Sequence, residues 1–131
     1  MRAVLIDVKH DKCKIIDVTG GLKEMYRLLD CDCIDVTYRD IQDGDGLYNV
    51  FNVVVDDEGL LKDSPIVSAR SRDDMSAQLV GNLLVFGVDW EEANYGDLAS
   101  LTDEEVKLVI GSLRRVIDFD TLRTHPVLLL D

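Results

Sequence analysis

The apolar residues of this chain come in short runs of strand length that are separated by polar turns. Two such runs flank the polar stretch Lys9-His10-Asp11-Lys12, a pattern typical of a β-hairpin. The runs together cover residues 2–8, 13–18, 34–38, 47–55 and 80–88. Because they are short and rich in β-branched residues, they predict a sheet in which neighbouring strands are mostly antiparallel.

Two segments have helical periodicity instead. The first places apolar residues at i, i+3, i+4 and i+7: Leu22, Met25, Tyr26 and Leu29. This spacing predicts a short helix that begins at Thr19 or at one of the glycines after it. Thr102 and Glu105 form a T-x-x-E capping box, which predicts the start of a longer helix. The apolar face of that helix is expected to run through Val106, Val109, Ile110, Leu113 and Ile117.

These patterns predict one α+β domain over residues 1–131, a length that suits a single core. We expect an antiparallel-rich sheet of about four to six strands, a short helix after strand two and a longer C-terminal amphipathic helix packed on one face. Residues 60–77 have no clear period and are expected to form an irregular segment that contains one short strand or one helical turn. The apolar tail, 119–131, is expected either to dock as an edge strand or to belong to a homo-oligomer contact.

The net charge of −12 limits the classes of partner. Direct contact with nucleic acid or anionic lipid is disfavoured, because those partners are held by clusters of Lys and Arg. No segment is apolar over a length that spans a bilayer, and the N-terminal apolar stretch is too short for a signal peptide. We therefore expect a cytoplasmic protein with Cys13, Cys31 and Cys33 reduced. The charge suits either solubility or a basic partner protein.

The strand at 80–88, the acidic loop after it, the helix start Ser100-Leu101-Thr102-Asp103-Glu104-Glu105 and the turn Gly59-Leu60-Leu61-Lys62 resemble a family of small proteins of unknown function. The similarity runs from about Val4 to Leu113. Members of that family occur in phages, plasmids and bacterial mobile elements. The resemblance implies an accessory protein that interferes with host defence, either by occupying a protein surface or by sequestering a small signalling molecule.

No catalytic or metal-binding signature is found. Asp43-Gly44-Asp45-Gly46 lacks the spacing of an EF-hand and is expected to be a tight polar turn. Cys31-Asp32-Cys33 has the spacing of neither a redox motif nor a zinc ribbon. His10 and His125 are not placed as a pair of metal ligands. The sequence therefore predicts a non-catalytic protein without a metal or a cofactor, with an enzyme that uses an unidentified carboxylate pair as the alternative.

Three polar residues form the first candidate site, which is a ligand site. Arg70 and Arg72 lie in the irregular segment, and guanidinium groups bind phosphate or carboxylate in a bidentate manner. Asn82 interrupts an apolar run and shares strand parity with Leu84 and Phe86, so it is expected to face inward. Together they predict sequestration of a small anionic, nucleotide-like ligand. The alternatives are surface salt bridges for the arginines and a purely structural asparagine.

The second candidate site is a protein-interaction site in the acidic loop. Trp90, Glu91, Glu92 and Tyr95 combine aromatic and acidic side chains. Such a loop is suited to a basic host protein, in a DNA-mimic-like manner if it takes the place of phosphates. The alternative for this segment is a solvated loop without a partner.

Overall fold

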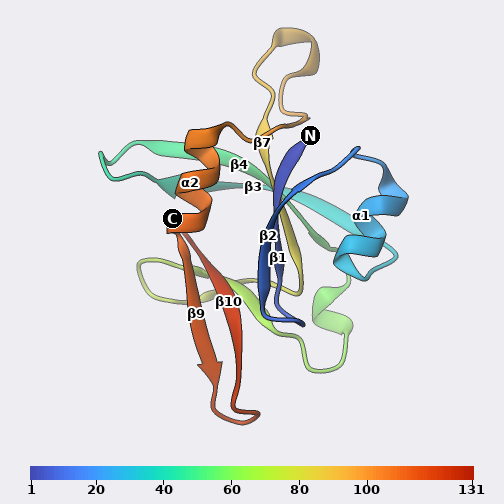
Figure 1. Ribbon diagram of the computed structural model, residues 1–131, viewed down its shortest axis with the longest axis vertical. Helices are drawn as coiled ribbons and strands as arrows, with labels where there is room; N and C mark the ends of the chain where they lie inside the picture. The colour runs from blue at the N-terminus through green and yellow to red at the C-terminus, as the bar shows by residue number, and fades with distance from the viewer.

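The computed structural model describes residues 1–131, which form two β-sheets and two short α-helices (Figure 1). The first sheet has the strand order β2-β1-β7-β4-β3, and β8 pairs with β7. Its strands are β1 (Arg2–Asp7), β2 (Lys12–Asp17), β3 (Ile34–Gln42), β4 (Tyr48–Asp56), β7 (Leu83–Val88) and β8 (Leu98–Ala99). Every neighbouring pair in this sheet is antiparallel, as the short runs and tight turns predict.

The second sheet has the order β6-β5-β10-β9. Its strands are β5 (Val67–Ser71), β6 (Ala77–Val80), β9 (Leu113–Asp118) and β10 (Arg123–Leu130). Only β5 and β10 pair in parallel. The segment 60–77, which was expected to be irregular, thus contains β5 and the start of β6, together with most of a 3₁₀ turn, η1 (Gly59–Leu61).

The first sheet is covered on both faces, which explains the uninterrupted apolar sequence of its central strands. On one face, Val4 and Val85 pack in a cluster with residues of the second sheet and of the helix α2 (Asp103–Gly111). On the other face, Leu5 and Leu84 pack with residues of the helix α1 (Leu22–Leu29). Because the larger cluster contains residues of both sheets, the chain forms one domain.

The helix α1 follows β2 and buries the predicted face through Met25 and Leu29. Its N-cap is Gly21, with no side-chain cap. Thr19 instead donates its backbone N–H to the carboxylate of Glu24 at 2.8 Å. The helix ends at Leu29, and its C-cap is Asp30, whose φ of 53° lies in the left-handed region.

The helix α2 has the predicted capping box. The N–H of Glu105 donates to Oγ1 of Thr102 at 3.1 Å, and the N–H of Thr102 donates to Oε1 of Glu105 at 2.9 Å. The expected continuation of the helix through Leu113 and Ile117 is wrong, because the helix ends at Gly111. Leu113 and Ile117 lie in β9, and the backbone pairing of β9 with β10 replaces the helical hydrogen bonds. Two strands therefore follow the helix that was expected to be C-terminal.

The apolar tail forms β10, an interior strand of the second sheet between β5 and β9. Its residues Val127–Leu130 are buried in the chain's own fold. The strand expected over 80–88 begins only at Leu83. Gly81, with φ of 77°, turns the chain between β6 and β7, so Asn82 lies in a turn and not within a strand.

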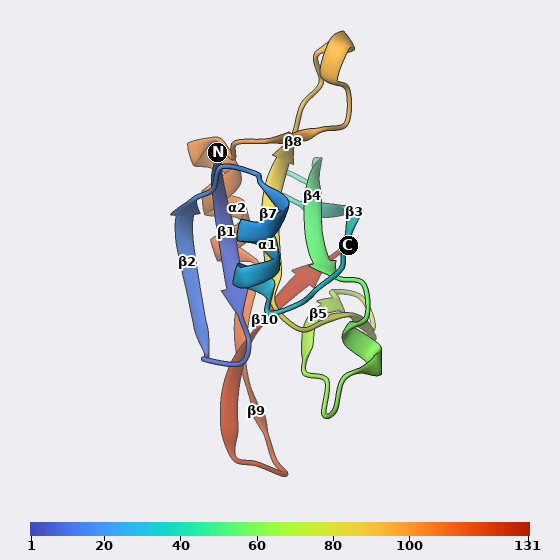
Figure 2. The same ribbon diagram turned by 90° about the vertical axis from the view of Figure 1, so that its right-hand side faces the viewer.

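Two segments project from opposite ends of the molecule along its longest axis (Figure 1 and Figure 2). One is the loop between β7 and β8, which contains the 3₁₀ turn η2 (Glu92–Asn94). The other is the hairpin of β9 and β10. None of the helices has the length and apolar character needed to cross a membrane.

Candidate functional site

The loop between β7 and β8, residues 89–97, holds all four of the predicted protein-interaction residues. The rings of Trp90 and Tyr95 meet edge to face, with centroids 5.3 Å apart and planes at 66°. Trp90 is 57% exposed and Tyr95 is 69% exposed. The two rings thus form an aromatic pair at the projecting end of the molecule, where no core covers them.

This loop is acidic and its charges are not neutralised within the chain. Its carboxylates are Asp89, Glu91, Glu92 and Asp97, and the segment has no Lys or Arg. None of the four forms an ion pair. Their negative charge is therefore available to a cation from outside the chain.

The base of the loop is fastened by a buried amide on β4. Asn52 donates from Nδ2 to the carbonyl oxygens of Gly87, Gly96 and Asp97, each at 3.1 Å. The hydroxyl of Tyr38 on β3 also donates to the Gly96 carbonyl at 3.1 Å. These bonds fix where the loop leaves the sheet, so the aromatic pair stands on a rigid base.

The backbone conformation and the close approach of Tyr38 both favour glycine at position 96, at this base. Its φ is 90°, a conformation that favours glycine. A Cβ at this position would also lie 2.5 Å from the Tyr38 hydroxyl oxygen. No local pattern in the sequence reveals the role of Asn52, because its three acceptors are backbone carbonyls more than thirty residues later in the chain.

The first candidate site is not assembled. Arg70 donates from Nη1 to the Met75 carbonyl at 2.8 Å. Arg72 lies near the C-terminus, with Nε 3.6 Å from Oδ1 of Asp131. Asn82 is at the other end of β5, where Gly81 donates to the Ile66 carbonyl. The three residues share no hydrogen-bond partner, and neither arginine lines the pocket that contains Asn82.

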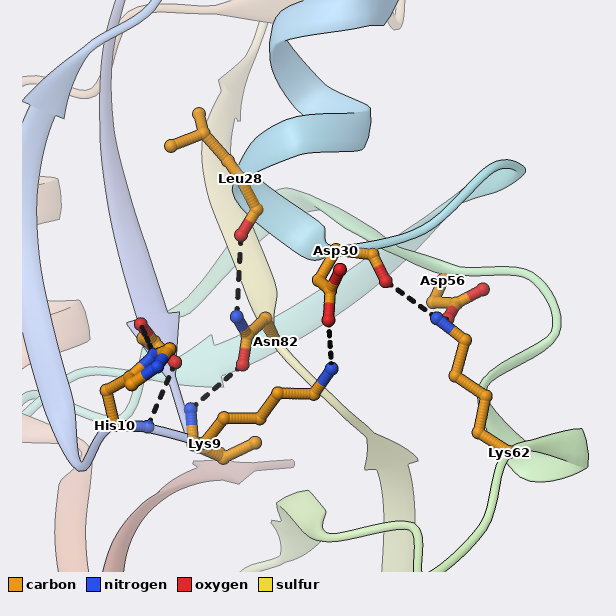
Figure 3. A network of polar contacts seen from close by, with 9 residues as sticks. Lys9, His10, Leu28, Asp30, Asp56, Lys62 and Asn82 are labelled. Carbon is orange, nitrogen blue, oxygen red and sulfur yellow. Dashed lines mark hydrogen bonds and ion pairs between the residues drawn. The ribbon is translucent and has the colours of Figure 1, made fainter.

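Asn82 has structural partners on both sides (Figure 3). Its Oδ1 accepts from the backbone N–H of Val8 at 3.0 Å, and its Nδ2 donates to the carbonyl of Leu28 at 3.4 Å. The amide thereby links the end of β1 to the last turn of α1. This arrangement matches the alternative of a satisfied structural asparagine.

Beside Asn82 lies a network of charged groups that the sequence did not suggest (Figure 3). Nζ of Lys9 lies 2.6 Å from Oδ2 of Asp30, and Nζ of Lys62 lies 2.6 Å from Oδ2 of Asp56. Lys62 also donates to the backbone carbonyl of Asp30 at 2.6 Å. Two ammonium groups from separate segments thus converge on the C-terminal end of α1.

The hydrogen bonds of this network shift the pKa values of its members. The hydrogen bond from Lys9 lowers the pKa of the Asp30 carboxyl, with the Lys9 charge as the next cause. The hydrogen bond to Asp56 raises the pKa of the Lys62 ammonium. Both groups are therefore ionised across the neutral pH range.

The three cysteines are free thiols, and each has a raised pKa. Burial is the main cause for Cys13 and Cys31, and the charge of Glu58 is the main cause for Cys33. A raised pKa keeps a thiol protonated and weakens it as a nucleophile. Nowhere in the chain do three or more His, Cys, Asp or Glu side chains group so that they could hold a metal ion.

The family model of a domain of unknown function, DUF3846, matches residues 1–114. This range contains both candidate sites and the charged network, and it ends within β9. No match is found among curated proteins or among solved structures.

Proposed function

The chain belongs to the DUF3846 family, whose function is unknown, and we propose that it is a non-catalytic protein-interaction module that docks loop 89–97 on a basic partner protein. The observation that carries this proposal is the exposed edge-to-face pair of Trp90 and Tyr95 among carboxylates that form no ion pair within the chain.

The chemistry of the loop selects the class of partner. Trp and Tyr are enriched among the residues that dominate binding energy at protein interfaces, because each buries a large rigid area at a small entropic cost. Carboxylates around them favour Lys and Arg on the partner and raise the association rate at low salt. A partner whose basic surface normally binds DNA would be blocked, with the loop in the position of the phosphates.

Sequestration of a small anionic ligand by Arg70, Arg72 and Asn82 receives less support. The two arginines lie near the end of β5 that is farther from Asn82, and the three residues share no hydrogen-bond partner. Neither arginine lines the pocket that contains Asn82. The interaction proposal has the advantage that its residues all lie within one short loop, whose base is held by the hydrogen bonds of Asn52.

The wider role that we propose is that of an accessory, anti-defence protein of phage or mobile-element type. The resemblance of the helix start at Thr102 and of the turn at Gly59 to a family from such elements motivates this context. It predicts that expression of the chain restores phage plating on a bacterial host whose defence system contains the basic partner. Unchanged plating on every host that carries the partner would contradict the anti-defence role.

The interaction is tested by cross-linking the chain to host proteins and measuring the affinity of each purified partner. Glu91→Lys with Glu92→Lys, or Trp90→Ala alone, is expected to abolish binding to a basic partner. The matched control is Asp57→Lys with Glu58→Lys, two adjacent exposed carboxylates in another turn, which should retain binding. Displacement of the chain by duplex DNA tests the DNA-mimic version. Equal loss in the control and loop variants would contradict a specific role for the loop.

A further inference from the structure

A cleft of about 620 Å³ lies between α1 and the turn that follows β1. It is lined by Lys9, Tyr26, Arg27, Asp30, Cys31, Asp32 and Lys62. A smaller, more enclosed pocket of about 110 Å³ adjoins it, and Lys9 and Lys62 line both. The larger volume is within the range of about 300–1,000 Å³ that is usual for small-molecule sites. This cleft lies apart from loop 89–97 and shares no residue with it.

Three cationic side chains gather in this cleft although the chain has a net charge of −12. Lys9 follows β1, Arg27 lies in the last turn of α1 and Lys62 follows η1. Arg27 forms no ion pair within the chain. Carboxylates of the chain hold Lys9 and Lys62 in this grouping, through Asp30 and Asp56, but none holds Arg27.

The cleft has more hydrogen-bond donors than the chain uses. An ammonium group has about three donors and a guanidinium about five. Lys62 gives one to Asp56 and one to the Asp30 carbonyl, and Lys9 gives one to Asp30. The guanidinium of Arg27 donates none within the chain. A ligand with several acceptor oxygens on one centre, as in a phosphate group, would satisfy these remaining donors.

Asp30 occupies the position in which such an acceptor would bind. Its carboxylate is exposed and lies 2.6 Å from Nζ of Lys9. Its backbone carbonyl, not its carboxylate, accepts from Lys62. The carboxylate can therefore swing away from Lys9 without disturbing the contact that holds Lys62 at the end of the helix.

We propose that this cleft binds a phosphate ester of mononucleotide size, whose phosphate oxygens replace the Asp30 carboxylate on Lys9 and also contact Arg27 and Lys62. The ring of Tyr26, which lines the cleft, provides an aromatic surface for the base, because stacking on Tyr is a common mode of base recognition. Asp30 acts as an internal competitor that keeps the cations paired while the cleft holds no ligand.

If Asp30 competes with the ligand, its replacement should raise the affinity for the phosphate ester. A purely structural ion pair between Lys9 and Asp30 predicts no such rise. Asp30→Asn keeps a residue that tolerates the left-handed conformation and keeps the backbone bond to Lys62. It removes the competing charge, so the affinity for the phosphate ester is expected to rise about two- to fivefold, the range that loss of one exposed ion pair allows. Lys9→Met and Arg27→Gln are expected to weaken binding. Substitution of Lys62 is a poorer test of the site, because it leaves the buried Asp56 carboxylate without an ion-pair partner.

The test is a titration of the isotope-labelled full chain with AMP, followed by backbone amide NMR shifts, with adenosine and inorganic phosphate as comparisons. Saturable shifts with millimolar AMP are expected for Lys9, for Tyr26 to Asp30 and for Lys62. Inorganic phosphate should shift the same amides more weakly, and adenosine should shift them little. Three results would overturn the site: no saturable shifts with AMP, equal shifts with adenosine, or weaker AMP binding by Asp30→Asn. Glu91→Lys with Glu92→Lys should leave AMP binding unchanged, so this test and the partner-binding test can fail separately.

Discussion

Asn52, in the middle of β4, donates a hydrogen bond of 3.1 Å from its side-chain amide to the carbonyl oxygen of Gly96, at the base of the projecting loop. The same amide reaches the carbonyls of Gly87 and Asp97. A residue that is 1% exposed thus joins the core of the first sheet to the segment that carries Trp90 and Tyr95.

Asn52→Ala is expected to lower the free energy of unfolding by about 1–3 kcal/mol, because it leaves buried carbonyl groups without a donor. Asn52→Asp should cost at least as much, since it turns carboxylate oxygens toward three carbonyl oxygens. Urea denaturation measures both, and Trp90 fluorescence reports on the loop. Asn94→Ala, an exposed change in the same loop, is the control. Equal stability of Asn52→Ala and Asn94→Ala would show that the amide does not fasten the loop.

Thr102→Ala is expected to cost about 1 kcal/mol, because it removes the side-chain acceptor for the N–H of Glu105 at the start of α2. Glu105→Gln keeps an acceptor for the N–H of Thr102 and should have a much smaller effect. Thermal unfolding of the two variants side by side makes the comparison. A larger loss for Glu105→Gln would contradict the assignment of the cap.

The loss of folding stability at low pH should depend on the carboxylate of Asp43. Its carboxylate accepts from the N–H groups of Leu47 and Asp45, and the hydrogen bond from Leu47 is the main cause of its lowered pKa. Because the folded pKa is below the ordinary aspartate value of 3.8, the carboxylate contributes stability above that value, and this contribution is lost as the pH falls through the folded pKa.

Asp43→Asn should therefore flatten the dependence of unfolding free energy on pH between about pH 2 and pH 5. Asp45→Asn is the control, because the Asp45 carboxylate makes no hydrogen bond although its backbone N–H does. Urea unfolding across the pH series gives the slope. An unchanged slope for Asp43→Asn would mean that this turn is not a source of the acid sensitivity.

Strand β10 should be part of the folding unit although it lies beyond the residues that the family model matches. Leu128 is fully buried in the cluster shared by the two sheets, so Leu128→Ala is expected to cost about 2–5 kcal/mol. Leu122→Ala, at an exposed position in the same hairpin, should change stability by less than about 0.5 kcal/mol. Similar urea midpoints for both variants would contradict the claim that β10 is part of the folding unit.

Local signals in the sequence predict the local structure well. The capping box at Thr102, the buried face of α1 and the polar turn held by Asp43 each depend on residues within a few positions of one another. Loop 89–97 belongs to the same class, because its aromatic and acidic residues lie within nine positions of one another in the chain. That these residues lie close together can be predicted without knowledge of the fold.

Features that depend on distant partners could not be predicted in this way. Leu113 and Ile117 fit a helical spacing, and only their pairing with β10 makes them a strand. In the folded chain Ile117 is 55% exposed. Its apolar side chain therefore does not mark a core face, although the sequence pattern counts it as one. The position of Asn82 relative to Arg70 and Arg72 also depends on distant pairing, because the sequence does not say near which end of β5 each residue lies.

The charged cleft is the clearest case of a site that sequence patterns do not reveal. Lys9, Arg27 and Lys62 come from three separate segments, and none stands in a recognisable motif. Only the packing of α1 between the turn after β1 and the segment after η1 brings them together. Lysine and arginine are abundant on protein surfaces, so no local pattern distinguishes these three from the others in the chain.

The most direct test of the central claim is the salt dependence of binding to a purified basic partner, compared between the unaltered chain and Glu91→Lys with Glu92→Lys. The unaltered chain is expected to lose affinity steeply as ionic strength rises, because exposed charges are screened over a Debye length of about 8 Å at physiological salt. The variant is expected to show no measurable binding at physiological salt, while Asp57→Lys with Glu58→Lys binds. A loop variant that binds with the same affinity and the same salt dependence as the unaltered chain would contradict docking through loop 89–97.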